Sequence, residues 1–425
     1  MLNRRDFLVR SLYGSSLLAM GSVVPQFLVN TARAAEEAGK DNILVVLEMS
    51  GGNDGLNTVI PYTDDLYHKY RPTLHFTKGQ VLKVNDEIGL HPAMQSFNQL
   101  LQNGQLAVVQ GVGYPNPDRS HFESMDIWQS ADPKRRTTTG WLARSAADLQ
   151  DKRGNVPLVQ VGPERLPLAF RGAASGVASI NNPKQFRLDL GQGDANHLKA
   201  RKRLLEDVAR GGASADKGGM LQFVQRRQLQ TYATLNRLQD VVKDPQFERP
   251  DRQFALYEKM QLVARLIGLG FGARVFYVSI DGFDTHSNQA EAHRNLLQQL
   301  SNSITGLFNS LKGLGQDKRV IVMTFSEFGR RVQENGSRGT DHGSGSCLFV
   351  TGPAVKAGVV GKHPSLKKEN LDYEITILDR LSGDLKYHTD FRRVYATLLD
   401  RWLGVDSKTV LAGQFEHLDL LKAKA

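Results

Sequence analysis

The amino-acid sequence predicts an α/β fold, with one doubly wound, mainly parallel sheet that carries helices on both faces. Short apolar runs without alternation, such as residues 42–49 and 320–325, are typical of strands covered on both faces of such a sheet. These runs alternate with segments of helical periodicity, as successive βα units require. Acidic and histidine residues directly follow several runs. In open α/β sheets the functional site lies beyond the carboxyl ends of the strands, so we expect it at that edge.

The first 34 residues have the features of an export signal. Residues 3–8 (NRRDFL) form a twin-arginine signature, residues 11–29 are apolar and rich in small residues, and residues 32–34 (ARA) form a cleavage site. An uncleaved membrane anchor is the alternative, but Gly, Ser and Pro interrupt the apolar run and leave it too short to span a bilayer. We therefore predict export through the twin-arginine translocase, a route that carries folded proteins, to the periplasm or the medium.

The composition of the chain narrows the classes of partner. The formal net charge is +10, and the predicted signal, with four Arg and one Asp, leaves +7 for the mature protein. This charge is spread out, which fits anionic substrates or an envelope surface and does not indicate nucleic acid. No later segment has 18 consecutive apolar residues, so no transmembrane segment is expected in the mature chain. Cys347, the only cysteine, lies in an apolar run and is expected to be buried.

The first predicted strand, residues 42–49, leads directly into a glycine-rich turn at residues 50–57 (SGGNDGLN). Backbone N–H groups of such a turn can bind an anion. The turn lacks the lysine of a P-loop and the spacing of a dinucleotide fingerprint, which excludes both motifs. Asp54 is the carboxylate offered at this strand end, either to a metal or as an ordinary Asp-Gly turn residue.

The second strand, residues 106–109, follows an amphipathic helix at residues 93–103 and precedes a proline-rich loop. Ser120 stands where that loop becomes a helix, with Glu123 three residues on, which is the pattern of a capping box. A serine hydroxyl at a helix N-terminus can also act as a nucleophile, because the helix end stabilises an oxyanion. Both interpretations remain open at this point. Arg119 and His121 flank the serine.

The middle of the chain changes character. A strand is predicted at residues 156–161, after which residues 181–260 are charged, rich in Gln and punctuated by Gly pairs, with a long helical pattern at 221–242. We predict a helical insertion over the sheet here. An apolar helix at residues 262–270 then returns the chain to the core.

The next strand is predicted at residues 274–280. Asp284 and His286 follow it and are expected just beyond its carboxyl end. These two residues are two positions apart, so in extended chain their side chains share a face. The helix at residues 289–312 follows and carries His293, which is expected to lie at the surface or to support the site.

The strand at residues 320–325 is followed by a polar loop and a second apolar run at residues 347–350. The loop contains the triplet Asp341-His342-Gly343, which places a carboxylate beside an imidazole. Four strand ends thus offer acids, histidines or a hydroxyl, and together they match what a pair of divalent metals needs. The same loop contains the candidates for orienting these ligands, Glu327, Arg330 and Arg331.

Seven motifs together resemble the DUF1501 family, over residues 43–404. They are GGNDGLNTVIPY, RSHFESMDIW, TTGWLAR, GFDTHSNQ, SEFGRR, TDHGSG and TDFRRVYATLLDRWLG. The family consists of exported twin-arginine proteins related to the alkaline phosphatase and sulfatase superfamily. The resemblance implies an alkaline-phosphatase-like α/β core with one or two divalent metals, and zinc, calcium, magnesium and manganese are not distinguished.

Residue roles follow from the resemblance, position by position. It implies Ser120 as the nucleophile, with Arg119 and His121 beside it. The implied metal ligands are Asp54, Asp284, His286, Asp341 and His342. A late histidine ligand is also expected, and His388 lies in a suitable region. His388, Asp390 and Arg392 are candidates for orienting the ligands or binding an anion. The spacing of Asp284 and His286 is narrower than the usual pair, and the chain has no Cys-x-Pro-x-Arg motif, so a formylglycine sulfatase is not expected.

The sequence therefore predicts a metal-assisted hydrolase of phosphate or sulfate esters, acting on an anionic small molecule or polysaccharide in the cell envelope. The alternative is a non-catalytic exported binding or scaffold protein that keeps the same fold. The predicted organisation is a signal peptide (1–34), one α/β domain (41–404) and a C-terminal tail (405–425).

Overall fold

A computed structural model of the protein describes residues 41–423, apart from 151–155, 163–164, 174–176, 181–254 and 375–381. The predicted signal peptide and all but the last six residues of the predicted insertion lie outside the described residues. Those six residues are the N-cap and the beginning of helix α10 (Leu256–Gly268). Within the described part of the chain, no helix combines the length and hydropathy needed to cross a bilayer.

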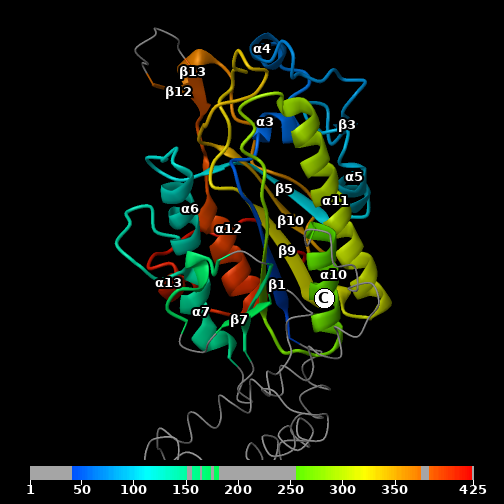
Figure 1. Ribbon diagram of the computed structural model, residues 1–425, viewed down its shortest axis with the longest axis vertical. Coiled ribbons are helices and arrows are strands. Elements are labelled where there is room, and N and C mark those ends of the chain that lie inside the picture. The colour runs from blue at the N-terminus through cyan, green and yellow to red at the C-terminus, as the bar shows by residue number, and fades with distance from the viewer. Residues whose placement is uncertain are drawn as a thin grey trace, which may run out of the picture.

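The core is a nine-stranded mixed sheet in the order β11-β5-β10-β9-β1-β8-β6-β7, with β14 also paired to β5 (Figure 1). Neighbouring strands are parallel except where β10 pairs with β5 and β9. The predicted doubly wound, mainly parallel α/β fold is confirmed. The strands are β1 (Ile43–Met49), β5 (Leu106–Gly113), β6 (Leu158–Val161), β7 (Val177–Ile180), β8 (Val275–Ile280), β9 (Val320–Phe325), β10 (Ser346–Thr351), β11 (Gly358–Val360) and β14 (Thr389–Asp390).

The antiparallel strand β10 has a simple cause. It follows β9 directly as its neighbour in the sheet, without a crossover helix, and a strand joined in this way must run back. The connecting loop, residues 326–345, therefore begins at the carboxyl end of β9 and stays at that edge of the sheet. This loop carries most of the candidate site residues.

Two apolar layers cover the two faces of the sheet, because successive side chains of a strand point to opposite faces. On one face Val45 and Leu47 of β1 pack with helices α5, α10 and α11. On the other, Leu44 and Val46 pack with α6, α7 and α12. Figure 1 shows the two helix layers on either side of the strands. Besides α10, the helices of these two layers are α5 (Gln95–Gln102), α11 (Gln289–Gly313), α6 (His121–Ser130), α7 (Trp141–Leu149) and α12 (Phe391–Leu398).

Small elements build up the carboxyl edge of the sheet around a third apolar cluster that includes Leu56, Tyr67, Val332 and Leu385. In Figure 1 several of them form the top of the molecule. They are α3 (Gly55–Thr58), α4 (Asp65–Tyr70), β2 (Val59–Ile60), β3 (Leu82–Lys83), β4 (Gly89–Leu90) and the hairpin of β12 (Leu371–Glu374) and β13 (Ser382–Leu385). These elements surround the loops that carry the candidate site.

The segment predicted as a C-terminal tail packs against the sheet. After a π-helical turn (Leu399–Leu403) comes helix α13 (Ser407–Val410), and Leu418 and Leu420 are buried in the core cluster of α12. Three 3-10 turns complete the described elements, at Leu168–Phe170, Asp317–Arg319 and Lys368–Asn370.

Candidate metal centre

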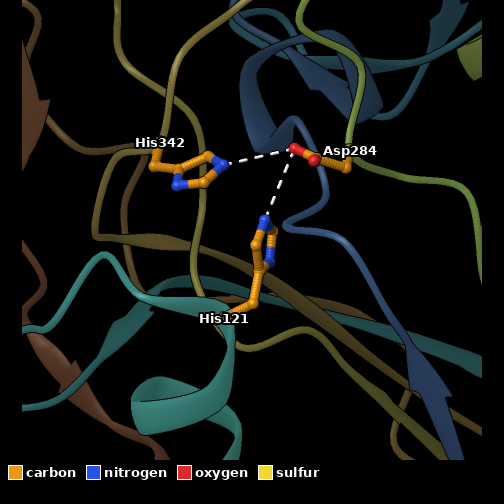
Figure 2. Close-up of side chains that lie close together, drawn as sticks. All are labelled: His121, Asp284 and His342. Atoms are coloured by element: carbon orange, nitrogen blue, oxygen red, sulfur yellow. Dashed lines mark hydrogen bonds and ion pairs between the residues drawn. The ribbon is translucent and has the colours of Figure 1, made fainter.

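Three loops meet at the carboxyl edge of the sheet and bring His121, Asp284 and His342 together. His121 is the first residue of α6, which follows β5. Asp284 lies in the loop after β8, and His342 lies in the loop between β9 and β10. Figure 2 shows the two imidazole rings directed at the Asp284 carboxylate. One ligand atom from each residue lies within 4.8 Å of the others, which is the spacing of a group that can hold one metal ion.

His286 adds a third imidazole to the group. One oxygen of Asp284, Oδ1, lies 3.0 Å from Nε2 of His286, 3.2 Å from Nε2 of His342 and 3.5 Å from Nε2 of His121. Nε2 of His286 also lies 2.9 Å from Nε2 of His342. The same nitrogen of each ring is thus turned toward one carboxylate oxygen.

The opposite nitrogen of each ring explains this orientation. Nδ1 of His121 lies 2.8 Å from Oε1 of Glu327, Nδ1 of His342 lies 2.8 Å from the carbonyl oxygen of Arg119, and Nδ1 of His286 lies 3.2 Å from Oδ1 of Asp341. Carbonyl and carboxylate oxygens only accept hydrogen bonds, so each ring donates through Nδ1. In the neutral imidazole the lone pair is then on Nε2, as in histidines that bind metals.

The separations between these atoms fit the size of a four-ligand metal shell. Ligands about 2.0–2.1 Å from an ion at tetrahedral positions lie roughly 3.3–3.4 Å from one another. The separations from Asp284 Oδ1 to the three Nε2 atoms, and that between Nε2 of His286 and Nε2 of His342, are 2.9–3.5 Å, while the ligand atoms of His121, Asp284 and His342 all lie within 4.8 Å of one another. Nε2 of His121 is buried and has no hydrogen-bond partner, so a positive centre would satisfy it. The residues present therefore fit a divalent metal.

Arg330 fixes the carboxylate in this group. Its buried guanidinium donates to Oδ1 of Asp284 at 2.7 Å and to the carbonyl oxygens of Gly52, Thr340 and Phe283. Partial burial of Asp284 favours its neutral form, but the hydrogen bond from Arg330 and the contact with the His342 ring outweigh this and lower the pKa of Asp284 to about 2. The carboxylate is therefore anionic at neutral pH and is held by a cation that cannot lose its proton.

The two histidines of Figure 2 differ in basicity. The hydrogen bond to Glu327 raises the pKa of His121, while burial lowers the pKa of His342. Both rings pack against the buried Phe328, whose centroid lies 4.9 Å from that of His121 and 4.8 Å from that of His342. The apolar ring covers one side of the imidazoles and limits the access of water there.

Asp341 lies behind His286. It is half exposed and accepts from Nδ2 of Asn335 at 3.0 Å, and the same amide donates to the carbonyl oxygen of His286 at 2.9 Å. Burial acts to raise the pKa of Asp341, but the bonds from Asn335 and His286 lower it. The structure therefore brings Asp341 to the site as the residue that orients His286.

Asp54 is not brought into the group. Its fully buried carboxylate accepts from both terminal nitrogens of Arg71, at 2.6 and 3.1 Å, and from Gln289. Burial opposes its ionisation, but Arg71 lowers the pKa of Asp54 overall. The guanidinium of Arg71 thus supplies the positive charge that a metal ion was expected to supply beside Asp54.

The glycine turn before Asp54 is engaged within the fold. The N–H of Gly51 donates to Glu327 at 2.8 Å, and the N–H of Asn53 donates to the hydroxyl of Ser326 at 2.9 Å. These are two of the N–H groups that the glycine-rich turn was expected to offer to an anion, and both already donate to side chains of the protein. His293, expected at the surface or beside the site, is instead fully buried, and its Nε2 lies 3.1 Å from Oδ1 of Asn53.

Ser120 is the N-cap residue of α6 and directly precedes His121. Its hydroxyl makes no capping hydrogen bond, so the predicted capping box is absent, and the residue is exposed. Arg119 contributes its carbonyl to His342, while its guanidinium binds Asp384 at 2.8 Å through Nε and 2.7 Å through Nη2. The serine thus adjoins His121 in the chain, whereas the Arg119 side chain is directed to Asp384.

The remaining candidates divide between two places. Arg331 borders the site, because its Nε donates to the carbonyl oxygen of His342 at 3.2 Å. His388 is engaged elsewhere, with Nε2 2.7 Å from the carbonyl oxygen of Lys362. Asp390 caps helix α12 and pairs with Arg392 at 2.6 Å. The structure does not bring His388, Asp390 or Arg392 to the imidazole group.

Sequence reasoning missed Asn335, Asp384 and Arg71. Each acts through a partner distant in sequence or outside any motif, and single polar residues of these types are common in loops.

Comparisons with known proteins give a family. The family model described as "Protein of unknown function (DUF1501)" matches residues 41–414. A search of curated proteins found no match.

Similar solved structures include the PsFucS1 sulfatase from Pseudoalteromonas sp., at 10% identity and a TM-score of 0.40, over 93% of this chain and 75% of that chain. The alkaline phosphatase from the Antarctic bacterium TAB5 matches at 12% identity and a TM-score of 0.32, over 74% and 93% of the two chains. The lipoteichoic acid synthase LtaP from Listeria monocytogenes matches at 9% identity and a TM-score of 0.35, over 83% and 73%. At these identities the likeness concerns the fold alone.

Proposed function

The chain belongs to the DUF1501 family, whose description assigns no function, and from the site itself we propose that it is a metal-assisted hydrolase of phosphate or sulfate esters. One observation carries the proposal: three imidazoles turn the same nitrogen to one carboxylate oxygen of Asp284, at separations that suit a single ion. Neutral imidazoles in this number are typical of a bound metal.

The donor set favours zinc or a similar transition metal. Calcium and magnesium take mainly oxygen ligands, whereas three imidazoles and one carboxylate suit zinc. We propose one ion, held by His121, His286, His342 and Asp284. A second ion beside Asp54 is not part of the proposal, because Arg71 already neutralises that carboxylate. Glu327, Asp341 and the carbonyl of Arg119 orient the three rings.

The bound ion and the residues of the protein have separate roles in the proposed hydrolysis. A bound divalent metal supplies Lewis-acid polarisation of an ester oxygen. The Ser120 hydroxyl is the nucleophile that we assign, because it is exposed, unused in capping and adjacent to His121 at the start of α6. Its oxygen would form a bond to the phosphorus or sulfur of the ester while the bond to the alcohol breaks. The hydroxyl proton would reach the leaving alcohol through water, and a water molecule would then hydrolyse the ester formed on the serine. Backbone N–H groups of that helix end stabilise negative charge that develops on the substrate. Asp284 stays ionised, held by Arg330, and keeps the ligand group intact.

The proposal places the enzyme outside the cytoplasm, as a single α/β domain acting on anionic small molecules or polysaccharide esters. The sequence signature at residues 1–34 supports export through the twin-arginine translocase. The spread positive charge of the mature chain supports an anionic substrate.

A non-catalytic binding protein is the second candidate, and specific observations favour it. Asp54, the expected ligand on the first strand, is neutralised by Arg71, and the Arg119 side chain, expected beside the nucleophile, is bound to Asp384. Such a protein would keep the fold and bind without turnover.

Metal content and turnover distinguish the two candidates. The purified protein is analysed for metals by mass spectrometry and assayed with aryl phosphates and aryl sulfates. The hydrolase predicts about one ion per chain, and Ser120→Ala is expected to keep the ion and lose at least about 10²-fold in kcat. Ser287→Ala, at an exposed serine in the loop after β8, is the matched control. Metal-free protein of unchanged stability, without turnover, would leave the binding function as the better account.

A further inference from the structure

We propose that Asp384, on the β12–β13 hairpin, is a positioning residue for His342. It acts through Arg119 and Arg331, and the proposal rests on the metal-binding role proposed above. Asp384 belongs to none of the motifs in the sequence and lies on a small sheet separate from the core sheet. Figure 1 shows the hairpin beyond the carboxyl edge of the main sheet.

The first link runs through Arg119. Nε and Nη2 of this guanidinium both donate to Oδ2 of Asp384, at 2.8 and 2.7 Å. The carbonyl oxygen of the same arginine accepts from Nδ1 of His342 at 2.8 Å. Asp384 thus holds the residue whose carbonyl decides which nitrogen of His342 carries the proton.

The second link runs through Arg331. Nε of this residue donates to the carbonyl oxygen of His342 at 3.2 Å and lies 3.9 Å from Oδ1 of Asp384. The two oxygens of one carboxylate therefore face two arginines that contact His342 from different sides, one at the ring and one at the backbone. The side chain of Asp384 is only 1% exposed, so solvent screens these charges less than it screens an exposed pair.

The hairpin is fixed at the position that this role requires. The N–H of Val332 donates to the carbonyl oxygen of Gly383, and the N–H of Gly345 donates to that of Leu385, each at 3.0 Å. Residues 332 and 345 belong to the two arms of the loop that carries His342. Asp384 lies between these two anchors and is therefore held between the arms.

Removal of the negative charge has a specific expected effect. Asp384→Asn leaves two guanidiniums that repel each other beside His342. The carbonyl of Arg119 then loses its fixed position, and the Nδ1 proton of His342 loses its acceptor. Changes to groups that orient a metal-binding histidine weaken metal affinity by about 10–100-fold, and we expect this range for zinc.

The test compares Asp384→Asn with Asp372→Asn in the full mature chain. Asp372 stands opposite Asp384 in the register of the hairpin, but it is 53% exposed and pairs with Lys386. Titration calorimetry with zinc gives the affinity, and thermal unfolding without metal reports the stability of the fold. Asp384→Asn is expected to weaken zinc binding and Asp372→Asn to leave it unchanged. Arg331→Gln is a second variant that removes only the backbone link, and a smaller loss of affinity is expected from it.

A second readout needs no metal. In metal-free protein labelled with ¹⁵N-histidine, at a pH where the rings are neutral, His342 is expected as the Nδ1–H tautomer, and its signals are assigned with His342→Gln. Asp384→Asn is expected to shift it toward a mixture with Nε2–H. An unchanged tautomer, with unchanged zinc affinity in both variants, would overturn the positioning role. A wild-type protein that binds no zinc but shows the tautomer shift would support the positioning role and contradict the proposed function.

Discussion

At the scale of single residues, hydrogen bonds to Nδ1 decide what the histidines can do. Glu327, Asp341 and the carbonyl of Arg119 each accept from one ring. The contact of Glu327 also raises the pKa of His121, through a charge-assisted bond. The carboxylate therefore makes His121 a better metal ligand. It also makes the ring bind a proton more tightly, so protons compete more strongly with the metal for Nε2.

We expect Glu327→Gln to weaken zinc binding by about 10–100-fold at neutral pH. In the wild type, the raised pKa of His121 means that acidification returns a proton to Nε2 and weakens binding from a pH above ~6.5 downward. In the variant this midpoint is expected at a lower pH, because the stabilising charge is gone. Zinc affinity measured between pH 5 and 8 checks both effects. Glu123→Gln, at a half-exposed residue in the first turn of α6, is the control, and an equal loss there would argue against the assignment.

At the scale of elements, the residues of the site come from the segments after β5, β8 and β9, and the turn after β1 lies against the loop after β8. Gly51, at a φ of +115°, lies so close to the loop after β8 that an added Cβ would be 2.4 Å from the backbone nitrogen of Asp284. Only glycine permits both this conformation and this approach. The turn after β1 therefore supports the ligand loop, although Asp54 itself is not a ligand.

Gly51→Ala is expected to lower both stability and zinc affinity, because the new methyl group displaces the backbone of Asp284. We expect a loss of more than ~1 kcal/mol in the free energy of unfolding. Urea denaturation and zinc calorimetry measure the two quantities. Gly79→Ala, where no atom lies within 4 Å of the added Cβ, is expected to change neither. Retention of full zinc affinity in Gly51→Ala would show that the two loops are independent.

The elements also show what the sequence can reveal. Unalternating apolar runs predicted β1, β8 and β9, and the Asp-x-His and Asp-His-Gly motifs pointed to the loops that converge, because both signals are local. The orientation of β10 depends on which strand it pairs with, and the neutralisation of Asp54 depends on Arg71 folding back from α4. Pairings of this kind cannot be predicted from a local pattern in the sequence. Ser120 with Glu123 matched a capping box, yet the hydroxyl makes no capping bond.

At the scale of the whole molecule, one sheet with two covered faces supports a polar edge, and some of its polar groups are buried. His91 and His293 lie there with ring centroids 6.0 Å apart. Burial lowers the pKa of His91 to about 3 and that of His293 to about 4. In the unfolded chain both would take up a proton near pH ~6.5. The folded state therefore excludes protons that the unfolded state binds.

Stability is accordingly expected to fall as the pH drops from about 6.5 to about 4. Each histidine contributes a slope of up to about 1.4 kcal/mol per pH unit in this window, and above it neither contributes. Urea denaturation between pH 4 and 8, with a chelator present, measures the slope. His293→Gln is expected to flatten it. An unchanged slope in that variant would place the acid sensitivity in other groups, such as the carboxylates.

The central claim, a metal held by three histidines and Asp284, is tested most directly by X-ray absorption spectroscopy of the zinc-loaded protein. One zinc per chain is expected, with nitrogen and oxygen ligands at about 2.0–2.1 Å and the multiple-scattering signature of three imidazoles. His342→Ala is expected to remove one imidazole from that signature. Zinc bound without imidazole ligands, or a protein that retains no zinc after dialysis, would contradict the account.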